Sequence, residues 1–225
     1  MPNLKRLFAG NKDIVIFLIG MIIVRSAIAD WYSVPSGSMY PTLIIGDRIV
    51  ANRLAYDLKI PFTDVILLHL DDPERGDIVT FISPEDGNRL VKRVIGLPGD
   101  VIEMRNEKLV VNGVAATYAA AEGDIATQLT PDYPGRQLVL NERLQARQQT
   151  IIVMPERGAV RSFGPVTVPA GEYLMLGDNR DNSRDSRFIG FIKRELLTGR
   201  VRHVAFSLDT ERYYLPRPAR FGAAL

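Results

Sequence analysis

The feature that most constrains the fold is a series of short apolar runs, rich in valine and isoleucine, that begins after residue 30. Runs of this length and composition are typical of β-strands. They lie at 47–51, 77–81, 90–95, 108–111, 172–176 and 201–206. Turn-forming dipeptides separate them: Arg75-Gly76, Asp86-Gly87, Pro98-Gly99, Asn112-Gly113 and Ala170-Gly171. Because the sequence lacks both a long amphipathic helix and a strand–helix alternation, it predicts a mainly β, antiparallel fold.

One stretch, residues 115–162, departs from this pattern. It is more polar and contains Pro131, Pro134 and the pair Gln148-Gln149. We therefore expect an inserted, less regular segment within a main domain of residues 30–225.

The first thirty residues have a different character. Residues 1–12 contain basic but no acidic side chains, and 14–24 are uncharged and mostly apolar. A helix over 13–29 would be roughly 25 Å long at ~1.5 Å per residue, which is marginal for crossing a bilayer. Trp31 and Tyr32 follow, as aromatic residues do at a membrane interface.

From the residues alone, three interpretations of this segment stay open. It could be a transmembrane anchor at 13–29, with the basic residues 1–12 kept in the cytoplasm. It could be a cleaved signal peptide, because Ala27-Ile28-Ala29 has the A-x-A pattern of a cleavage site. It could also be a helix buried in the core.

Composition excludes several classes of site. The chain has no cysteine, which excludes disulfides, thiolate catalysis and cysteine-ligated zinc. Its histidines, His69 and His203, stand in apolar, strand-like surroundings, so we expect both to be packed structural residues. A zinc site needs three or four ligands, and neither histidine has a companion at ligand spacing, so we expect no metal or other cofactor. A net charge of +2 and the lack of a basic run interleaved with aromatics give no indication of nucleic-acid binding.

Two segments each contain a candidate reactive group, although the first could also be an ordinary serine–glycine loop and the second an exposed strand lysine with a solvated tip. In 35–42, prolines restrict the backbone, and Gly37 permits a tight turn between Ser36 and Ser38, which could present a hydroxyl at a defined angle. In the predicted strand 90–95, Lys92 shares a face with apolar residues on either side. Burial there would lower the pKa of the lysine, and a neutral lysine can take a proton from a serine hydroxyl.

A third segment, residues 177–187, carries three acidic and three basic side chains after an apolar strand. It lacks the glycine and the terminal glutamate of an EF-hand loop, so calcium binding is not predicted. We expect ion pairs that make this loop rigid.

These segments resemble the type I signal peptidases of bacteria. That family shows a Pro-Ser-Gly-Ser-Met-x-Pro-Thr box, an Arg-Gly-Asp box, a Lys-Arg box ending in Gly-x-Pro-Gly-Asp, and a final Gly-Asp-Asn box. The corresponding segments here, in the same order, are Pro35–Thr42, Arg75–Val79, Lys92–Asp100 and Gly177–Arg187. The resemblance covers roughly residues 30–110 and 165–205 and the N-terminal segment.

The resemblance implies a role for each matching residue. Ser38 would be the nucleophile and Lys92 its general base, while the Ser36 hydroxyl and the Ser38 backbone N–H would form the oxyanion hole. Ser183 would hydrogen-bond the lysine amine and orient it. Supporting roles fall to the remaining matches: Asp185 and Arg187 would pair to hold the loop, and Val34 and Val91 would line a shallow pocket for small side chains.

The function implied is that of a serine endopeptidase. It would remove N-terminal signal peptides from exported preproteins after small residues at A-x-A sites, with the substrate docked as an added β-strand. The family keeps its N-terminal segment, which favours a single-pass anchor at 13–29 in the bacterial inner membrane, with the catalytic domain on the extracytoplasmic side. The implied partners are preproteins and the lipid bilayer. Three alternatives remain: a self-cleaving repressor, a specialised conjugation or pilus peptidase, and a non-enzymatic surface binding module.

Overall fold

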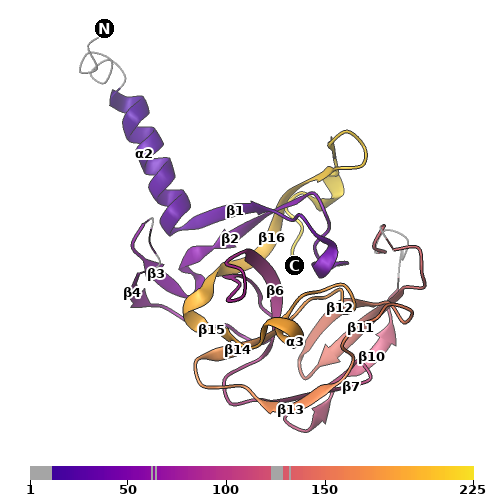
Figure 1. The fold of residues 1–225 in the computed structure, drawn as a ribbon. Helices are drawn as coiled ribbons and strands as arrows, with labels where there is room; N and C mark the ends of the chain where they lie inside the picture. Colours follow the sequence, from indigo (N-terminus) through magenta and orange to yellow (C-terminus); the bar gives the residue numbers. More distant parts are fainter. Residues whose placement is uncertain (1–11, 62, 64, 123–128, 132) are drawn as a thin grey trace.

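The computed structural model describes residues 12–61, 63, 65–122, 129–131 and 133–225. Its first element, helix α2 (Lys12–Ala27), projects from one end of a β-rich body (Figure 1). Within the described ranges, no helix combines the length and apolar character needed to cross a membrane. Of the basic residues predicted to stay in the cytoplasm, those before Lys12 lie outside the described residues.

The main sheet has eight strands, and every pairing in it is antiparallel. In spatial order its strands are β1 (Ala29–Ser33), β2 (Asp47–Asn52), β16 (Leu197–Asp209), β5 (Ile78–Ile82), β6 (Arg89–Gly96), β14 (Glu172–Leu176) and β15 (Ile192–Lys193), with β17 (Leu215–Pro216) paired to β16. The predicted antiparallel, mainly β fold is therefore confirmed. Each apolar run that was predicted to be a strand corresponds to one: β2, β5, β6, β8 (Lys108–Val111), β14 or β16.

In the described residues, three smaller sheets accompany the main sheet. One contains β13 (Phe163–Thr167), β7 (Val101–Arg105), β8 and β9 (Val114–Ala115); the second contains β10 (Thr117–Ala120), β11 (Leu138–Leu144) and β12 (Arg147–Val153); and the third is the hairpin of β3 (Asp57–Lys59) and β4 (Ile66–His69). The short helices are η1 (Gly37–Met39), η2 (Arg53–Ala55), α3 (Ser186–Ile189), η4 (Arg194–Leu196) and η5 (Pro218–Arg220).

The inserted segment is more regular than its composition predicted, since the β10–β12 sheet lies within it. Its polar residues are partly internal. Glu142 on β11 is fully buried, and both its carboxylate oxygens accept hydrogen bonds from Arg180. A buried polar residue that is paired in this way is compatible with a packed strand, and a partner so far along the chain leaves no trace in the local sequence.

Two apolar clusters fix the position of the turn at 35–42. Val34 and Met39 belong to a cluster with Ile49 of β2 and Val204 of β16. The inserted sheet packs on the other side of the turn, where Tyr40 meets a cluster that contains Ile152 of β12. The turn is therefore held between the main sheet and the inserted sheet.

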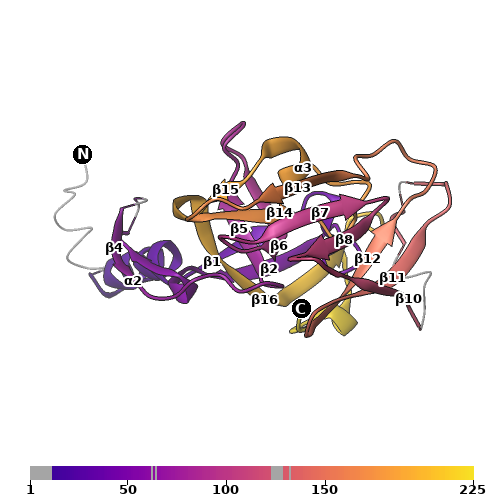
Figure 2. The same cartoon turned by 90° about the horizontal axis from the view of Figure 1, so that it is seen from below.

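Both histidines are exposed, which corrects the expectation that they are packed. His69 is on β4, all four residues of which are exposed, including Leu67 and Leu68. The apolar run there does not enter a core, because the β3–β4 hairpin lies outside the main sheet, at the end of the molecule where α2 projects (Figures 1 and 2).

Candidate active site

Ser38 lies in η1, and backbone hydrogen bonds hold both ends of this turn. The Val34 N–H donates to Asp47 O at 2.9 Å, and the Leu43 N–H donates to Met39 O at 2.9 Å. Gly37 and Met39, the neighbours of Ser38, are buried, whereas Ser38 itself is half-buried. The backbone of Ser38 is therefore held in place, while the residue remains partly accessible to solvent.

Lys92 lies on β6, between β5 and β14 in the centre of the main sheet. Its Nζ lies 2.7 Å from Ser38 Oγ, within hydrogen-bond distance. Only 3% of the lysine is exposed. This burial lowers the pKa of Lys92 from 10.5 to about 8, against the opposing effect of Asp185 and Asp178. A large fraction of the lysine is consequently neutral in mildly alkaline solution and can accept a proton.

Ser38 and Lys92 open into a cavity of about 220 Å³, which we call the front cavity. Its lining comprises Tyr32, Ser33, Val34, Pro35, Ser36, Ser38, Met39, Arg89, Leu90, Val91 and Lys92. The structure thus brings together Ser36, Ser38, Lys92 and both valines that the sequence singled out. A serine hydroxyl, a buried lysine amine and apolar side chains share one opening.

The loop 177–187 packs against the turn that carries Ser38. Asp185 and Arg187 form a buried bidentate ion pair, with Arg187 Nε 2.8 Å from Asp185 Oδ1. Asp185 also accepts a hydrogen bond from the Gly177 N–H at 3.0 Å. Gly177 fits closely against the turn that carries Ser38, because a Cβ there would lie 2.5 Å from Ser38 O and would also clash with Ser183 Oγ.

Ser183 does not make the hydrogen bond that the family resemblance implies. Its Oγ is buried and has no hydrogen-bond partner among the described residues, so the expected bond to the Lys92 amine is not formed. The lysine amine is instead directed at Ser38, and the Ser183 hydroxyl lies against the backbone of Gly177.

Among the residues that the structure describes, no group of three or more histidine, aspartate or glutamate side chains could hold a metal ion.

Comparison with known proteins identifies the family. A family model described as "Signal peptidase, peptidase S26" matches residues 9–206. The chain belongs to this family.

Individual relatives agree with that assignment. The chain is 35% identical over 223 residues to a protein named signal peptidase I from Pseudomonas fluorescens, covering 92% of this chain and 75% of the relative. It is 37% identical over 179 residues to a signal peptidase I from Pseudomonas aeruginosa, covering 77% of this chain and 59% of the relative. A crystal structure of a signal peptidase I from Enterococcus faecalis V583 is 32% identical, covers 58% of this chain and 97% of that chain, and has a TM-score of 0.35.

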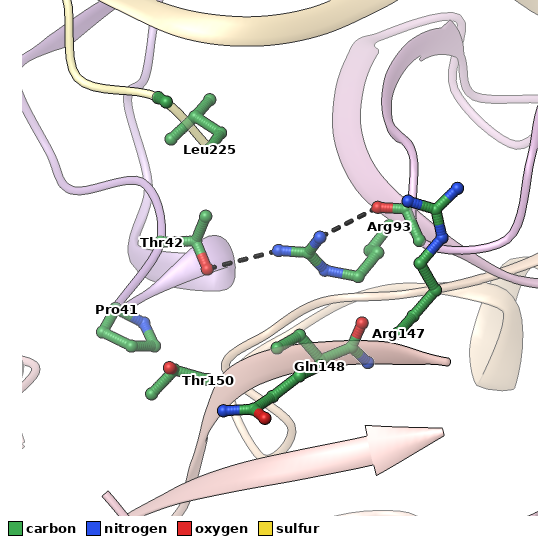
Figure 3. A pocket seen from close by; sticks show the side chains of 10 residues that line it. Pro41, Thr42, Arg93, Arg147, Gln148, Thr150 and Leu225 are labelled. Carbon is green, nitrogen blue, oxygen red and sulfur yellow. Dashed lines mark hydrogen bonds between the residues drawn. The ribbon is translucent and has the colours of Figure 1, made fainter. Parts of the chain in front are cut away.

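A second hydrogen-bond network lies beside the turn that carries Ser38. Arg93 follows Lys92 on β6 and so points to the opposite face of the sheet. It donates two hydrogen bonds to the carboxylate of Asp178, at 2.8 and 2.6 Å, and one to Gly76 O at 2.9 Å. Arg93 also reaches Thr42 Oγ1 at 3.4 Å, which ties β6 to the end of the turn (Figure 3).

A rear cavity of about 580 Å³ adjoins this network. Arg93 and Thr42 line one side, and Gln148 and Thr150 of β12 line the other (Figure 3). No motif in the sequence indicates this cavity, because its walls come from the main sheet and from the inserted one.

Sequence reasoning also missed Asn179. This residue is fully buried, and its side chain donates to Gly37 O at 3.0 Å and to Thr130 Oγ1 at 2.9 Å. Asn179 belongs to the final motif of the chain, but a role for it depends on partners that are distant in sequence.

Proposed function

We propose that this chain is a membrane-bound serine endopeptidase that removes N-terminal signal peptides from exported preproteins. Ser38 is the nucleophile and Lys92 the general base. The observation that carries this proposal is the 2.7 Å separation of Lys92 Nζ and Ser38 Oγ at the wall of an open cavity. Membership of the signal peptidase family supports the choice of substrate.

The reaction begins when the neutral Lys92 amine takes the proton of the Ser38 hydroxyl. Ser38 Oγ attacks the carbonyl carbon of the scissile peptide bond, and the Ser38 N–H with the Ser36 hydroxyl stabilises the resulting oxyanion. The lysine then gives its proton to the departing amine, which leaves an ester between Ser38 and the signal peptide. Water, deprotonated by the same lysine, hydrolyses this ester and frees Ser38.

The substrate is an extended segment with small side chains near the cleavage site. β14 pairs with β6 only over Arg93–Gly96, so the Leu90–Lys92 edge has no neighbouring described strand on that side. An extended peptide added to this edge would pass Ser38 and direct alternate side chains toward Val34 and Val91. The small volume of the front cavity favours alanine at these positions, which accounts for A-x-A cleavage sites.

Ser183, Asp185 and Arg187 act as supports in this scheme. The Asp185–Arg187 pair holds the loop beneath the dyad. The Ser183 hydroxyl, which has no competing partner among the described residues, is free to turn toward the Lys92 amine as the site closes on substrate.

The enzyme is anchored in the bacterial inner membrane by the segment 13–29, with residues 1–12 in the cytoplasm and the catalytic domain, 30–225, on the extracytoplasmic side. The apolar side chains of α2 support this proposal, as do the exposed ones of β4 beside it. Intact-mass analysis of the membrane fraction tests it. A mature species that begins at Asp30 would identify the segment as a cleaved signal instead.

The decisive experiment compares preprotein processing by wild type, Ser38→Ala and Lys92→Ala. Both variants should lose processing while remaining folded, because a nucleophile and its base act as a unit. Ser33→Ala is the matched control, since Ser33 lines the same cavity but takes no part in the scheme. Substantial turnover by folded Ser38→Ala would refute Ser38 as the nucleophile, whereas the absence of turnover by folded wild type would leave a binding module as the better interpretation.

A further inference from the structure

We propose that Asn179 is a positioning residue that sets the direction of the oxyanion-binding N–H of Ser38. The inference rests on the proposed function, because it concerns the hydrogen-bond donor that would stabilise the tetrahedral intermediate.

Asn179 contacts the carbonyl groups on both sides of the Ser38 nitrogen. Its side-chain Nδ2 donates to Gly37 O at 3.0 Å, and its backbone N–H donates to Ser38 O at 3.1 Å. In a trans peptide unit the C=O of one residue and the N–H of the next point in opposite directions. Fixing the Gly37 carbonyl toward Asn179 therefore turns the Ser38 N–H away from Asn179 and toward the front cavity.

The turn alone does not provide this restraint in full. Gly37 O also accepts a hydrogen bond from the Tyr40 N–H, at 3.2 Å, but that bond is local to the turn and moves with it. The bond from Asn179 ties the same carbonyl to a separate element. Gly37 itself has no side chain to restrict rotation of its peptide units, so an external restraint has a larger effect here than at most positions.

The inserted segment 115–162 holds Asn179 in place. Asn179 Nδ2 also donates a hydrogen bond to Thr130 Oγ1 at 2.9 Å. The side chain of Gln137 in turn binds the backbone of Thr130: its Oε1 accepts from the Thr130 N–H at 2.8 Å, and its Nε2 donates to Thr130 O at 2.9 Å. On either side of Asn179, hydrogen bonds of 2.9 Å join Asp178 O to the Ile152 N–H of β12 and the Arg180 N–H to Ile152 O. In this proposal the inserted segment orients the oxyanion hole through Asn179, without touching the substrate.

A cost in stability at the same residue supports a functional role. Asn179 is 0% exposed, yet its Oδ1 has no hydrogen-bond partner among the described residues. A buried, unsatisfied amide oxygen is unfavourable, and an apolar side chain of similar size would avoid it. What the asparagine supplies that leucine cannot is the pair of donors on Nδ2.

Asn179→Leu tests the proposal, because it removes those donors while keeping the volume and the backbone bond to Ser38 O. Kinetics on a signal-peptide substrate should show kcat lower by about 10- to 100-fold, less than the 10²–10³-fold that follows outright loss of an oxyanion donor. KM and the acidic limb of the pH profile should not change, since neither substrate docking nor Lys92 is altered. Asn182→Leu, on the same loop, is the matched control and should retain wild-type kcat.

A second measurement distinguishes a change in the direction of the Ser38 N–H from a general loosening of the turn. Ser36→Ala removes the other oxyanion donor, so its effect should be smaller in the Asn179→Leu background than in wild type. If Asn179→Leu does not fold, the smaller Asn179→Ala also removes the Nδ2 donors without adding a charge and should show the same loss of kcat. An unchanged kcat in the folded variant overturns the proposal. So does an effect confined to KM or to the acidic limb of the pH profile. A failure of wild type to cleave would instead overturn the proposed function.

Discussion

The pH dependence of cleavage is the most direct test of how Lys92 works. Burial lowers the pKa of this lysine to about 8. At pH 7 about one molecule in ten then carries the neutral amine, compared with roughly one in 3,000 for a lysine of ordinary pKa. In the proposed reaction the neutral form is the active one, so kcat/KM should rise about tenfold per pH unit on the acidic side and level off above about pH 8.

The assay is cleavage of a model preprotein between pH 5 and 10, with folding monitored at each pH. The apparent pKa belongs to the coupled site and not to Lys92 alone. Histidine is the main confounder because it titrates in a neighbouring range. Neither His69 nor His203 lines the front cavity, so the double variant His69→Gln/His203→Gln should keep the acidic limb. A folded double variant without that limb, or a limb centred near pH 10, would refute the reasoning.

Three further predictions concern the surroundings of the dyad. Gly177→Ala should lower kcat by about 100-fold, because its Cβ would lie 2.5 Å from Ser38 O and a displacement of about 1 Å in a catalytic group has that effect; near-wild-type turnover would contradict it. Ser183→Ala should slow cleavage without lowering the melting temperature, since its hydroxyl has no partner to lose among the described residues; unchanged kcat would remove Ser183 from the scheme. Glu142→Ala should cost about 3–5 kcal/mol in chemical denaturation, because it leaves the buried Arg180 unpaired. Its control, Glu74→Ala at an exposed ion pair, should cost less than about 1 kcal/mol.

The sequence predicted well whatever depends on neighbouring residues. Short runs of valine and isoleucine between glycine turns identified β2, β5, β6, β14 and β16 of the main sheet, since alternation and turn chemistry are local. Lys92 and Ser38 were paired by the resemblance of their motifs, and not by any local rule, because they are 54 residues apart. The front cavity brings both together with Val34 and Val91.

The sequence-based predictions were wrong or incomplete where contacts with residues distant in the chain determine the structure. The inserted segment was expected to be irregular because it is polar, but Glu142 finds its partner Arg180 38 residues away. Asn179 was overlooked for the same reason, since its acceptor in Gly37 is 142 residues distant. His69 was expected in the core because its strand is apolar, yet the hairpin that carries it lies outside the main sheet.

The burial of Lys92 also has a thermodynamic consequence for the folded state. Its pKa is lower in the folded chain, about 8, than the 10.5 of an exposed lysine, so the folded state binds protons less readily than the unfolded state. Below about pH 8 the folded protein must hold a buried ammonium group, and the penalty is about 3 kcal/mol at roughly 1.4 kcal/mol per pKa unit. The penalty falls as pH rises from about 8 to 10.5 and is absent above that range. Lys92→Met should therefore be inactive yet more stable than wild type at pH 7, and the difference in unfolding free energy should disappear above about pH 10.5.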